Sequence, residues 1–519
     1  MTPRERERTS EDGSAADTTR THTVILSDLH LTEEEPLDPQ RPLWKRYKQR
    51  AQFIDDSFAR WLDAMCQQVT EAGSSPADVE LVLAGDIFDF DAVTAVPSDP
   101  PWPVSWLERR RGLDPEEDKS RFKIEVILRD HPVWVDAVQR FIHAGGRVVF
   151  LMGNHDIELQ WPAVQQELLR AFDLREARSD AIRFAEWFYV TGETLIEHGN
   201  QYDAYSMCND PILPFIDRGD VRRLRLPFGN IAGRLMLNGM GLFNPHVESS
   251  FIMSFREYVV FFLKYMTRVQ PLLVWAWLWS AMATLVRALS DGLHPTARDP
   301  VRFAERVDDI AERANSTSST TLALQQLHAH PAIFNPFKIL RELWLDRALL
   351  MLALFYVSFQ LVLLVNAFVP VSFMWTLAAL ALLSPAVLFY ARSVQTDVYD
   401  AQKASLGKIA LAAQLTGTRR VVHGHTHREL HTVIDGVEHL NAGSWSPGYR
   451  DAECTKPFGR KCFIWLEPTE GGARTARLYA WRDPSFELLT GREDIGVVRW
   501  KHQPGTSVAP SFAPPQPLA

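Results

Sequence analysis

Short runs of apolar and β-branched residues recur along most of the chain, and each run ends in a cluster of Asp, Asn, His or Gly. The clearest of these runs are 24–26, 81–83, 148–151, 195–196 and 420–422. The segments around 51–69, 133–142, 162–171 and 401–415 have the apolar periodicity of amphipathic helices instead. Strands that alternate with helices predict an α/β fold, in which ligands bind in loops at the carboxyl ends of the strands.

A different pattern occupies residues 348–391, which are 44 positions without a charged side chain. A helical stretch of that length makes about two crossings of a ~30 Å hydrocarbon core, and Pro370 near its middle suits a turn between two helices. A buried hairpin in a soluble protein is the alternative, but helices in globular domains are typically ~10–14 residues long. The pattern therefore favours a membrane hairpin over 348–391.

A second apolar region covers 251–289 and carries Trp275, Trp277 and Trp279. Charged residues interrupt its first half. Tryptophans around a short apolar core fit an interfacial helix as well as a membrane span, so both interpretations stay open at this point.

A basic cluster precedes this region at Arg218, Arg222, Arg223 and Arg225. Basic residues next to apolar sequence can meet anionic headgroups, which is one interpretation of the cluster. The alternative is a lid with a solvated basic face.

Composition narrows the class of protein. Charged residues make up 23% and hydrophobic residues 46% of the 519 positions, which excludes a chain that is disordered throughout. The formal net charge is −9, so the chain as a whole offers no basic field for nucleic acid. The four cysteines are scattered without a C-x-x-C pair, which argues against a disulfide scaffold or a zinc knuckle. We expect disordered tails at 1–20 and 501–519, and the first twenty residues contain no secretory signal.

The polar clusters at the ends of the five predicted strands share one chemistry. A single Gly-Asp or a lone histidine after a strand is usually a turn or an ordinary polar residue. In series, however, the clusters supply two carboxylates, an amide and several imidazoles, which is the donor set of a dinuclear divalent-metal centre. The five blocks are 27–30, 85–89, 153–156, 198–200 and 423–427.

In this order, the blocks resemble the signature of the calcineurin-like metallophosphoesterase superfamily, which reads D-x-H, G-D, G-N-H-D/E, H and G-H-x-H. The resemblance covers roughly 21–210 and 419–481. It implies an α/β fold, a four-layer sandwich of two β-sheets flanked by helices, whose core is formed by 21–210 and 393–500. The segment 211–392 between them is then a large helical, membrane-associated insertion.

The resemblance also assigns metal ligands. It implies two divalent metal ions, Mn²⁺ in first place with Fe or Zn²⁺ as alternatives, that share Asp86 as a bridging ligand. A hydroxide that bridges the ions would attack phosphorus while both ions neutralise the phosphoryl oxygens. The other ligands are Asp28, His30 and His427 for one ion, and Asn154, His198 and His425 for the second.

In the family, the histidine after the ligand asparagine stabilises the transition state and protonates the leaving oxygen, a catalytic role that falls on His155 here. Asp156 would orient the His155 imidazole, or else cap a helix that starts near residue 157. His423 is expected to support a ligand. Asp89 and Arg428 flank ligand blocks, where they either contact substrate or face solvent.

The insertion between the fourth and fifth blocks makes the sequence similar to the UDP-diacylglucosamine pyrophosphohydrolase branch of this superfamily. That branch has an arginine at the position of His155, so the departure leaves the substrate undefined. The resemblance implies a membrane-associated hydrolase of a phosphate ester or pyrophosphate bond in an amphiphilic, lipid-linked substrate, with membrane lipids as further partners. Two alternatives stay open: a membrane-tethered hydrolase of soluble substrates, such as a nucleotide phosphodiesterase or protein phosphatase, and a non-catalytic membrane scaffold.

Both halves of such a catalytic domain must lie on one side of the membrane, because they supply ligands to the same ions. Lys338, Arg341, Arg347 and Arg392 flank the 348–391 hairpin, while its turn contains no Lys or Arg. The positive-inside rule then predicts an inner (cytoplasmic) membrane protein whose catalytic domain faces the cytoplasm.

Overall fold

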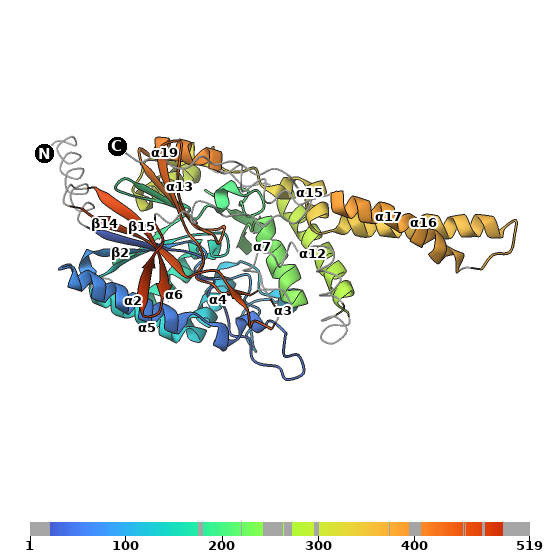
Figure 1. Cartoon of the computed structure of the whole chain (residues 1–519), viewed down its shortest axis with the longest axis horizontal. Helices are drawn as coiled ribbons and strands as arrows, with labels where there is room; N and C mark the ends of the chain where they lie inside the picture. Colours follow the sequence, from blue (N-terminus) through green and yellow to red (C-terminus); the bar gives the residue numbers. More distant parts are fainter. Residues whose placement is uncertain are drawn as a thin grey trace.

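The computed structural model describes residues 21–174, 180–218, 221–241, 263, 272–294, 300–372, 374–393, 406–449, 451, 453–469 and 473–490. The two predicted tails, 1–20 and 501–519, lie outside these residues, as does most of the first half of the 251–289 region. Figure 1 shows a body of sheets and helices from which a long helical hairpin extends.

The first sheet has seven strands in the order β16-β15-β14-β1-β2-β3-β4. Strands β1 to β4 are parallel, and β14 joins β1 in antiparallel register with Val24 opposite Trp465. The C-terminal strands therefore extend the sheet that the N-terminal part of the chain begins. The bounds are β1 His22–Leu26, β2 Val79–Ala84, β3 Arg147–Leu151, β4 Ile182–Ala185, β14 Cys462–Pro468, β15 Arg474–Arg482 and β16 Ser485–Leu488.

The second sheet has five strands in the order β10-β11-β9-β6-β5. Its central strands β6 and β9 are parallel neighbours, with Leu195 opposite Val421, although a long insertion separates them in the chain. This pairing brings the ends of the fourth and fifth predicted strands together. The bounds are β5 Phe188–Thr191, β6 Thr194–Glu197, β9 Arg420–His423, β10 Glu429–Ile434 and β11 Val437–Ala442; a separate pair consists of β12 Gly448–Tyr449 and β13 Pro457–Phe458.

Alternation along the strands builds a layered structure. In β2, Leu81 and Leu83 face one layer of helices and Val82 faces the second sheet. In β9, Val422 faces the first sheet and Val421 faces another layer of helices. The order is therefore helices, sheet, sheet, helices, as expected for an α/β sandwich. The first helix layer contains α2 Asp55–Glu71, α4 Glu117–Asp130, α5 Pro132–His143 and α6 Pro162–Ala171, and the second contains α13 Pro300–Arg313, α14 Ser318–Gln325 and α19 Ile409–Thr416.

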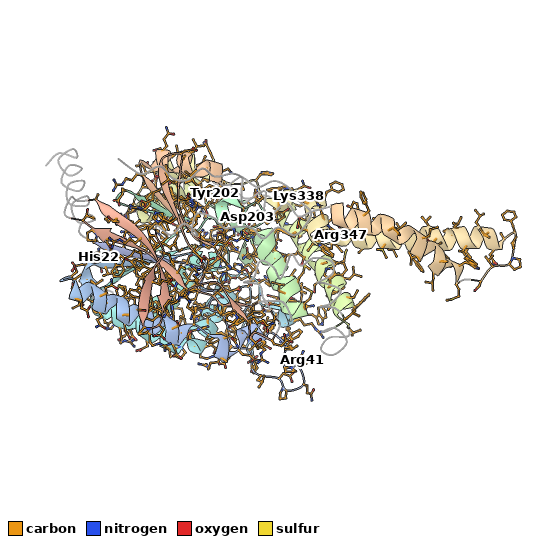
Figure 2. The ribbon with its side chains drawn as sticks, in the orientation of Figure 1. His22, Arg41, Tyr202, Asp203, Lys338 and Arg347 are labelled. Carbon is orange, nitrogen blue, oxygen red and sulfur yellow. The ribbon has the colours of Figure 1, made fainter. Side chains whose placement is uncertain are left out.

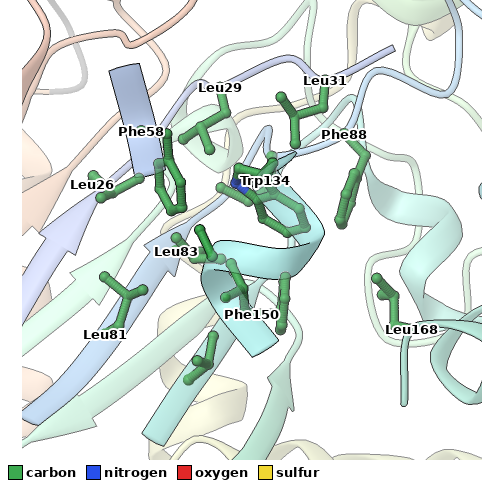
Figure 3. Close-up of a cluster of buried hydrophobic side chains, with 14 of the residues drawn as sticks. Leu26, Leu29, Leu31, Phe58, Leu81, Leu83, Phe88, Trp134, Phe150 and Leu168 are labelled. Carbon is green, nitrogen blue, oxygen red and sulfur yellow. The ribbon is translucent and has the colours of Figure 1, made fainter. Parts of the chain in front are cut away.

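Aromatic side chains fill the core between the first helix layer and the first sheet. Trp134 lies at the centre of this cluster, with ring centroids 5.6 Å from Phe88 and 5.9 Å from Phe58. Figure 3 shows these rings packed with Leu83 and Phe150 from the sheet. This packing fixes the strands whose ends carry the polar blocks.

The segment between β6 and β9 begins with short elements that pack around a separate core, which includes Phe228, Ile231 and Ile339. The later helices α13 and α14 fall in the range predicted for the insertion, yet they pack on the second sheet through Val307 and Leu324. The bounds are β7 Phe215–Arg218, β8 Val221–Leu224, α7 Phe228–Ala232, η7 Gly233–Leu237, α8 Asn238–Met240, α12 Leu273–Leu293, η9 Ala332–Phe334, α15 Pro336–Glu342 and η10 Leu406–Lys408.

Two helices, α16 (Leu345–Asn366) and α17 (Trp375–Ser393), form a hairpin whose turn contains Pro370 and which projects from the body (Figure 1). Within the described residues, α16 is the one helix that is long and apolar enough to cross a membrane, and most of it is exposed. Helix α12 from the 251–289 region differs from this hairpin. One of its faces packs into the insertion core through Ala281 and Ala288, so it lies along the body.

Candidate metal centre

The predicted ligands lie just beyond the carboxyl ends of strands from both sheets. Asp28, Asp86 and Asn154 follow β1, β2 and β3 of the first sheet, while His198 and His425 follow β6 and β9 of the second. Because parallel strands end at the same edge, both sheets deliver their polar loops to one place.

Asp28, His30 and His427 form the first group. The His427 Nε2 atom lies 3.1 Å from Asp28 Oδ1, and His30 Nε2 lies 3.8 Å from the same oxygen and 3.3 Å from His427 Nε2. One ligand atom from each residue therefore falls within 4.8 Å of the others. Burial would raise the pKa of Asp28, but the two histidines outweigh burial and hold the pKa well below its ordinary range. The group is a carboxylate with two imidazoles, which suits a divalent transition metal.

Asp86, His198 and His425 form the second group. His198 Nδ1 is 2.9 Å from the carbonyl oxygen of Ala84, so Nδ1–H donates there and Nε2 carries the lone pair. That Nε2 atom lies 3.1 Å from Asp86 Oδ2, and His30 Nε2 of the first group lies 3.8 Å from the same oxygen. Asp86 Oδ2 thus stands between the two groups, where a bridging ligand has to be.

Three buried ligand atoms test whether metal ions fit this site. Asp28 Oδ1, Asn154 Oδ1 and His198 Nε2 have no hydrogen-bond partner among the described residues. A buried polar atom left without a partner costs ~1–3 kcal/mol, so three such atoms on predicted ligands fit residues that would bind cations. Nitrogen and oxygen donors of these kinds fit Mn²⁺, Fe or Zn²⁺.

The ligand loops have unusual backbone conformations. Five ligands have positive φ angles, which non-glycine residues rarely adopt and which cluster at functional sites. They are Asp28 (56°), His30 (49°), Asp86 (53°), His425 (63°) and His427 (55°), among eleven such residues in the described part of the chain.

Glycines at these turns allow close packing against the ligands. A Cβ atom on Gly153 would lie 2.2 Å from Asp86 Oδ1, and one on Gly85 would lie 2.5 Å from the His198 ring. Any side chain at either position would therefore displace a ligand, which explains why glycine precedes Asp86 and Asn154.

His155 lies beside the bridging carboxylate. Its backbone N–H donates to Asp86 Oδ1 at 2.8 Å, and its Nδ1 atom is 3.3 Å from Asp89 Oδ1 and 3.7 Å from Asp91 Oδ2. Burial would lower the pKa of His155, but the carboxylates of Asp89 and Asp86 outweigh burial and raise the pKa to about 10. With Nδ1 held by Asp89, Nε2 is the ring atom left to donate a proton to substrate.

Asp156 does not take the place that the sequence suggested. Its Oδ1 accepts the N–H of Gly153 at 2.5 Å and its Oδ2 accepts the N–H of Ile87 at 2.8 Å, so it ties two ligand loops together. Asp89 occupies the position beside the His155 imidazole. The short helix η4 (Ile157–Gln160) receives no side-chain cap from Asp156 either.

Several residues that the sequence analysis did not single out support the site. Asp203 Oδ2 lies 3.1 Å from His425 Nε2, which leaves Nδ1 of that ring for a metal. Asn230 of α7 donates through Nδ2 to the Asn154 carbonyl at 2.8 Å and to Asp91 Oδ2 at 2.6 Å. No motif marks either residue, because their role depends on contacts between distant segments.

His423 lies behind the ligands as expected. Its Nε2 atom is 3.1 Å from Glu197 Oε2, which also accepts from the Tyr202 hydroxyl at 2.7 Å. Its Nδ1 atom is 3.2 Å from His439 Nε2. This buried chain of polar groups braces the ends of β6 and β9.

Comparison with known families agrees with this geometry. Residues 21–225 match the family model described as calcineurin-like phosphoesterase. The chain carries a calcineurin-like phosphoesterase domain. The match includes the ligands from Asp28 to His198, whereas His425 and His427 lie beyond it. No curated protein sequence matches the chain significantly.

Members of the calcineurin-like phosphoesterase family use divalent metal ions to hydrolyse phosphoesters, and this domain has the candidate His and Asp groups for such ions. The match therefore supports metal-dependent phosphoester hydrolysis as the class of activity.

Three of the four arginines in the basic cluster of the insertion have partners within the protein, and the side chain of the fourth, Arg218, lies outside the described residues. Arg223 Nη2 pairs with Asp291 Oδ1 at 2.5 Å, and Arg225 is fully buried and donates to the carbonyl oxygens of Asp291 and His294. Arg222 pairs with Asp217 at 2.8 Å. Arg223 and Arg225 therefore stabilise the insertion itself, which favours the alternative of a lid over a headgroup site at these two residues.

Proposed function

We propose that this protein is a membrane-associated, dinuclear-metal phosphoesterase that hydrolyses a phosphate ester or pyrophosphate bond of an amphiphilic substrate. The observation that carries the proposal is the position of Asp86 Oδ2 between two groups of ligands, one of which comes from both ends of the chain. Convergence of this kind supports the seven-residue ligand set of Asp28, His30, Asp86, Asn154, His198, His425 and His427.

The residues around the metal centre would have different roles in hydrolysis. Two divalent ions, when bound, would supply positive charge for the phosphate oxygens and make a water more acidic. Asp86 would hold both ions at a fixed separation. Protonated His155 would donate from Nε2 to the leaving oxygen, while Asp89 keeps its ring in place through Nδ1. Asp156 would serve by keeping the 86–87 and 153–156 loops together.

An amphiphilic substrate is supported by how the insertion meets the site. Asn230 at the start of the insertion contacts the loop of ligand Asn154, and the same insertion later leads into the exposed apolar hairpin. A simple membrane tether would not need contact with a ligand loop. The proposed substrate therefore reaches the metals from the membrane, with its apolar chains near the insertion.

The proposed orientation follows from the charges at the base of the hairpin. Figure 2 shows Lys338 and Arg347 where α16 leaves the body, on the side of the catalytic domain. Basic residues that stay on one side of a membrane span favour the cytoplasmic side. We therefore propose that the domain faces the cytoplasm from the inner membrane.

The test compares hydrolysis of an acylated phosphodiester with that of its chain-free analogue, using the Mn²⁺-loaded full chain in detergent micelles. Each buried methylene is worth up to ~0.8 kcal/mol, so four of them would give a preference of up to roughly 200-fold in kcat/KM. Equal kcat/KM on both substrates would instead identify a tethered enzyme of soluble phosphoesters. No hydrolysis of any phosphoester with Mn²⁺, Fe²⁺ or Zn²⁺ would favour the non-catalytic scaffold.

A further inference from the structure

A cavity of about 460 Å³ lies apart from the metal ligands. Its walls come from the loop that contains Arg41, from α3 (Glu108–Arg111), and from α8 and α12 of the insertion. Five cationic side chains line it, and no acidic residue of the described structure does: Arg41, Lys45, Arg109, Arg110 and Arg111.

Three of these cations have no counterion among the described residues. Arg41 pairs with Asp38 at 2.9 Å and Lys45 with Glu35 at 3.5 Å. Arg109, Arg110 and Arg111 form no ion pair with any carboxylate in the described ranges of the chain. By contrast, the buried arginines Arg223 and Arg234 of the insertion pair with Asp291 and Asp114, so the positive charge that lines this cavity is less neutralised than theirs.

Helix α12, which closes the cavity with Trp275, carries an exposed apolar stripe. Trp275, Trp279, Met282 and Val286 follow the spacing i, i+4, i+7 and i+11, which places them on one face. All four are exposed, whereas Ala281 on the opposite face is buried. A helix with tryptophans on an exposed apolar face is typical of one that lies in a membrane interface.

Aromatic and basic groups join the stripe to the cavity. Trp106 contacts Trp279 edge to face, with ring centroids 6.2 Å apart. The Arg110 guanidinium lies 4.8 Å over the Trp106 ring. The apolar stripe and the cationic cavity therefore form one continuous surface.

This surface also continues into the hairpin. Residues of α12 and α15 share the insertion core, and α15 leads directly into α16. Figure 1 shows α12 running across the direction in which the α16–α17 hairpin extends. If the hairpin crosses a bilayer, α12 is placed along the surface of that bilayer.

We propose that this cavity, the arginine pocket, binds the phosphate headgroup of an anionic membrane lipid while the α12 stripe lies in the interface. The inference rests on the proposed membrane association but not on hydrolysis. Charge complementarity favours an anionic over a zwitterionic lipid, since each basic residue near an anionic surface is worth ~1 kcal/mol.

The pocket is separate from the metal centre. Asn238 lines it and donates through Nδ2 to the Asp91 carbonyl at 2.7 Å and to the Arg111 carbonyl at 3.0 Å. Asp91 in turn faces His155 at 3.7 Å. Asn238 and Asp91 thus separate the pocket from the metal centre. A substitution in one site can therefore be made without removing a residue of the other.

The experiment titrates the full chain in detergent with dioctanoyl phosphatidylglycerol and follows binding by calorimetry. Dioctanoyl phosphatidylcholine and glycerol 3-phosphate serve as the zwitterionic and chain-free probes. The variant is Arg109→Gln with Arg110→Gln, two exposed positions, and the matched control is Arg60→Gln with Arg140→Gln, two exposed arginines of α2 and α5. An Asp86→Asn chain removes the bridging ligand and isolates the pocket from the metals.

We expect phosphatidylglycerol to bind more tightly than either other probe, and the pocket variant to weaken that binding roughly 30-fold. The control and the Asp86→Asn chain should bind as the parent does. Unchanged affinity in the pocket variant would overturn the proposal. So would loss of binding in Asp86→Asn alone, which would locate the phosphate at the metals, or equal affinity for glycerol 3-phosphate, which would indicate a site for free phosphate anions. Hydrolysis by the pocket variant reports separately on the proposed function.

Discussion

The sandwich and the α16–α17 hairpin are built from the same apolar residue types but use them in opposite ways. In β1, Val24, Ile25 and Leu26 are completely buried between layers that the chain itself supplies. On α16, Leu352 and Leu364 are 64% and 61% exposed. Soluble monomers rarely expose contiguous apolar patches larger than a few hundred Å², and none of the described residues covers these side chains. In the proposed function, the sandwich performs the chemistry and the hairpin places the protein at a membrane.

Among changes that leave the metal ions bound, the largest effect is expected from damage to the sandwich alone. His155→Ala should lower kcat by ~10²–10⁴-fold, because the leaving oxygen loses its proton donor, while metal content and the hairpin stay unchanged. The measurement is steady-state hydrolysis of an ester with a poor leaving group, with metal content followed in parallel. His330→Ala, at an exposed position, is the matched control. Full activity of the His155 variant would remove it from the mechanism.

The difference between the two regions can be tested with one leucine from each. Leu83 in β2 is completely buried, so Leu83→Ala should lower the free energy of unfolding by ~2–5 kcal/mol. Leu352→Ala on the hairpin should change it by no more than ~0.5 kcal/mol in detergent. Denaturant unfolding of both variants gives the two values. Similar losses would mean that the hairpin is packed within the protein, and the contrast between the two regions would be wrong.

A smaller, pH-dependent effect is expected where the chain passes from the helices on the second sheet to the insertion core. Both ring nitrogens of His328, just after α14, are buried without a hydrogen-bond partner in the described structure. Burial lowers its pKa from 6.5 to about 4. Between those pH values the unfolded chain binds a proton that the folded chain does not, so stability falls as the pH decreases through this window.

His328→Leu should remove this acid sensitivity, up to about 3 kcal/mol between pH 6.5 and 4. Thermal unfolding from pH 7 to pH 4.5 is the measurement, and the exposed His330→Leu is its control. Parallel pH curves for the parent and the His328 variant would contradict the assignment.

The sequence predicts the fold and the ligand blocks well for a physical reason. In a buried strand, each apolar residue can face only one layer, and the polar loop that follows lies at the edge of the sheet. The alternation of residues and the spacing of the motifs are therefore enough to predict both. The strands at 24–26, 81–83 and 420–422 all appear, and their polar ends meet at one edge. The helical hairpin around Pro370 is also present. A long run of uncharged residues can adopt few structures other than a helix, and the proline favours a turn near its middle.

Contacts between distant segments are what the sequence leaves out. Asp89, rather than neighbouring Asp156, holds His155, since the fold and not chain order sets which carboxylate faces the ring. Asn230 reaches the ligand loop from 76 residues away. From the sequence alone, Arg223 could bind a headgroup, but in the fold it pairs with Asp291. Whether a charge is paired is a property of the tertiary structure alone.

The central claim is that both ends of the chain hold two metal ions through a shared Asp86. The most direct measurement is the metal content of the purified full chain after loading with Mn²⁺ and removal of excess metal, alongside hydrolysis by the same samples. The account predicts two Mn²⁺ per chain in the parent and in an Asp63→Ala control, at an exposed position, with metal and hydrolysis lost together in Asp86→Ala. An Asp86→Ala chain that keeps both ions, or a parent that hydrolyses phosphoesters without binding any, would contradict it.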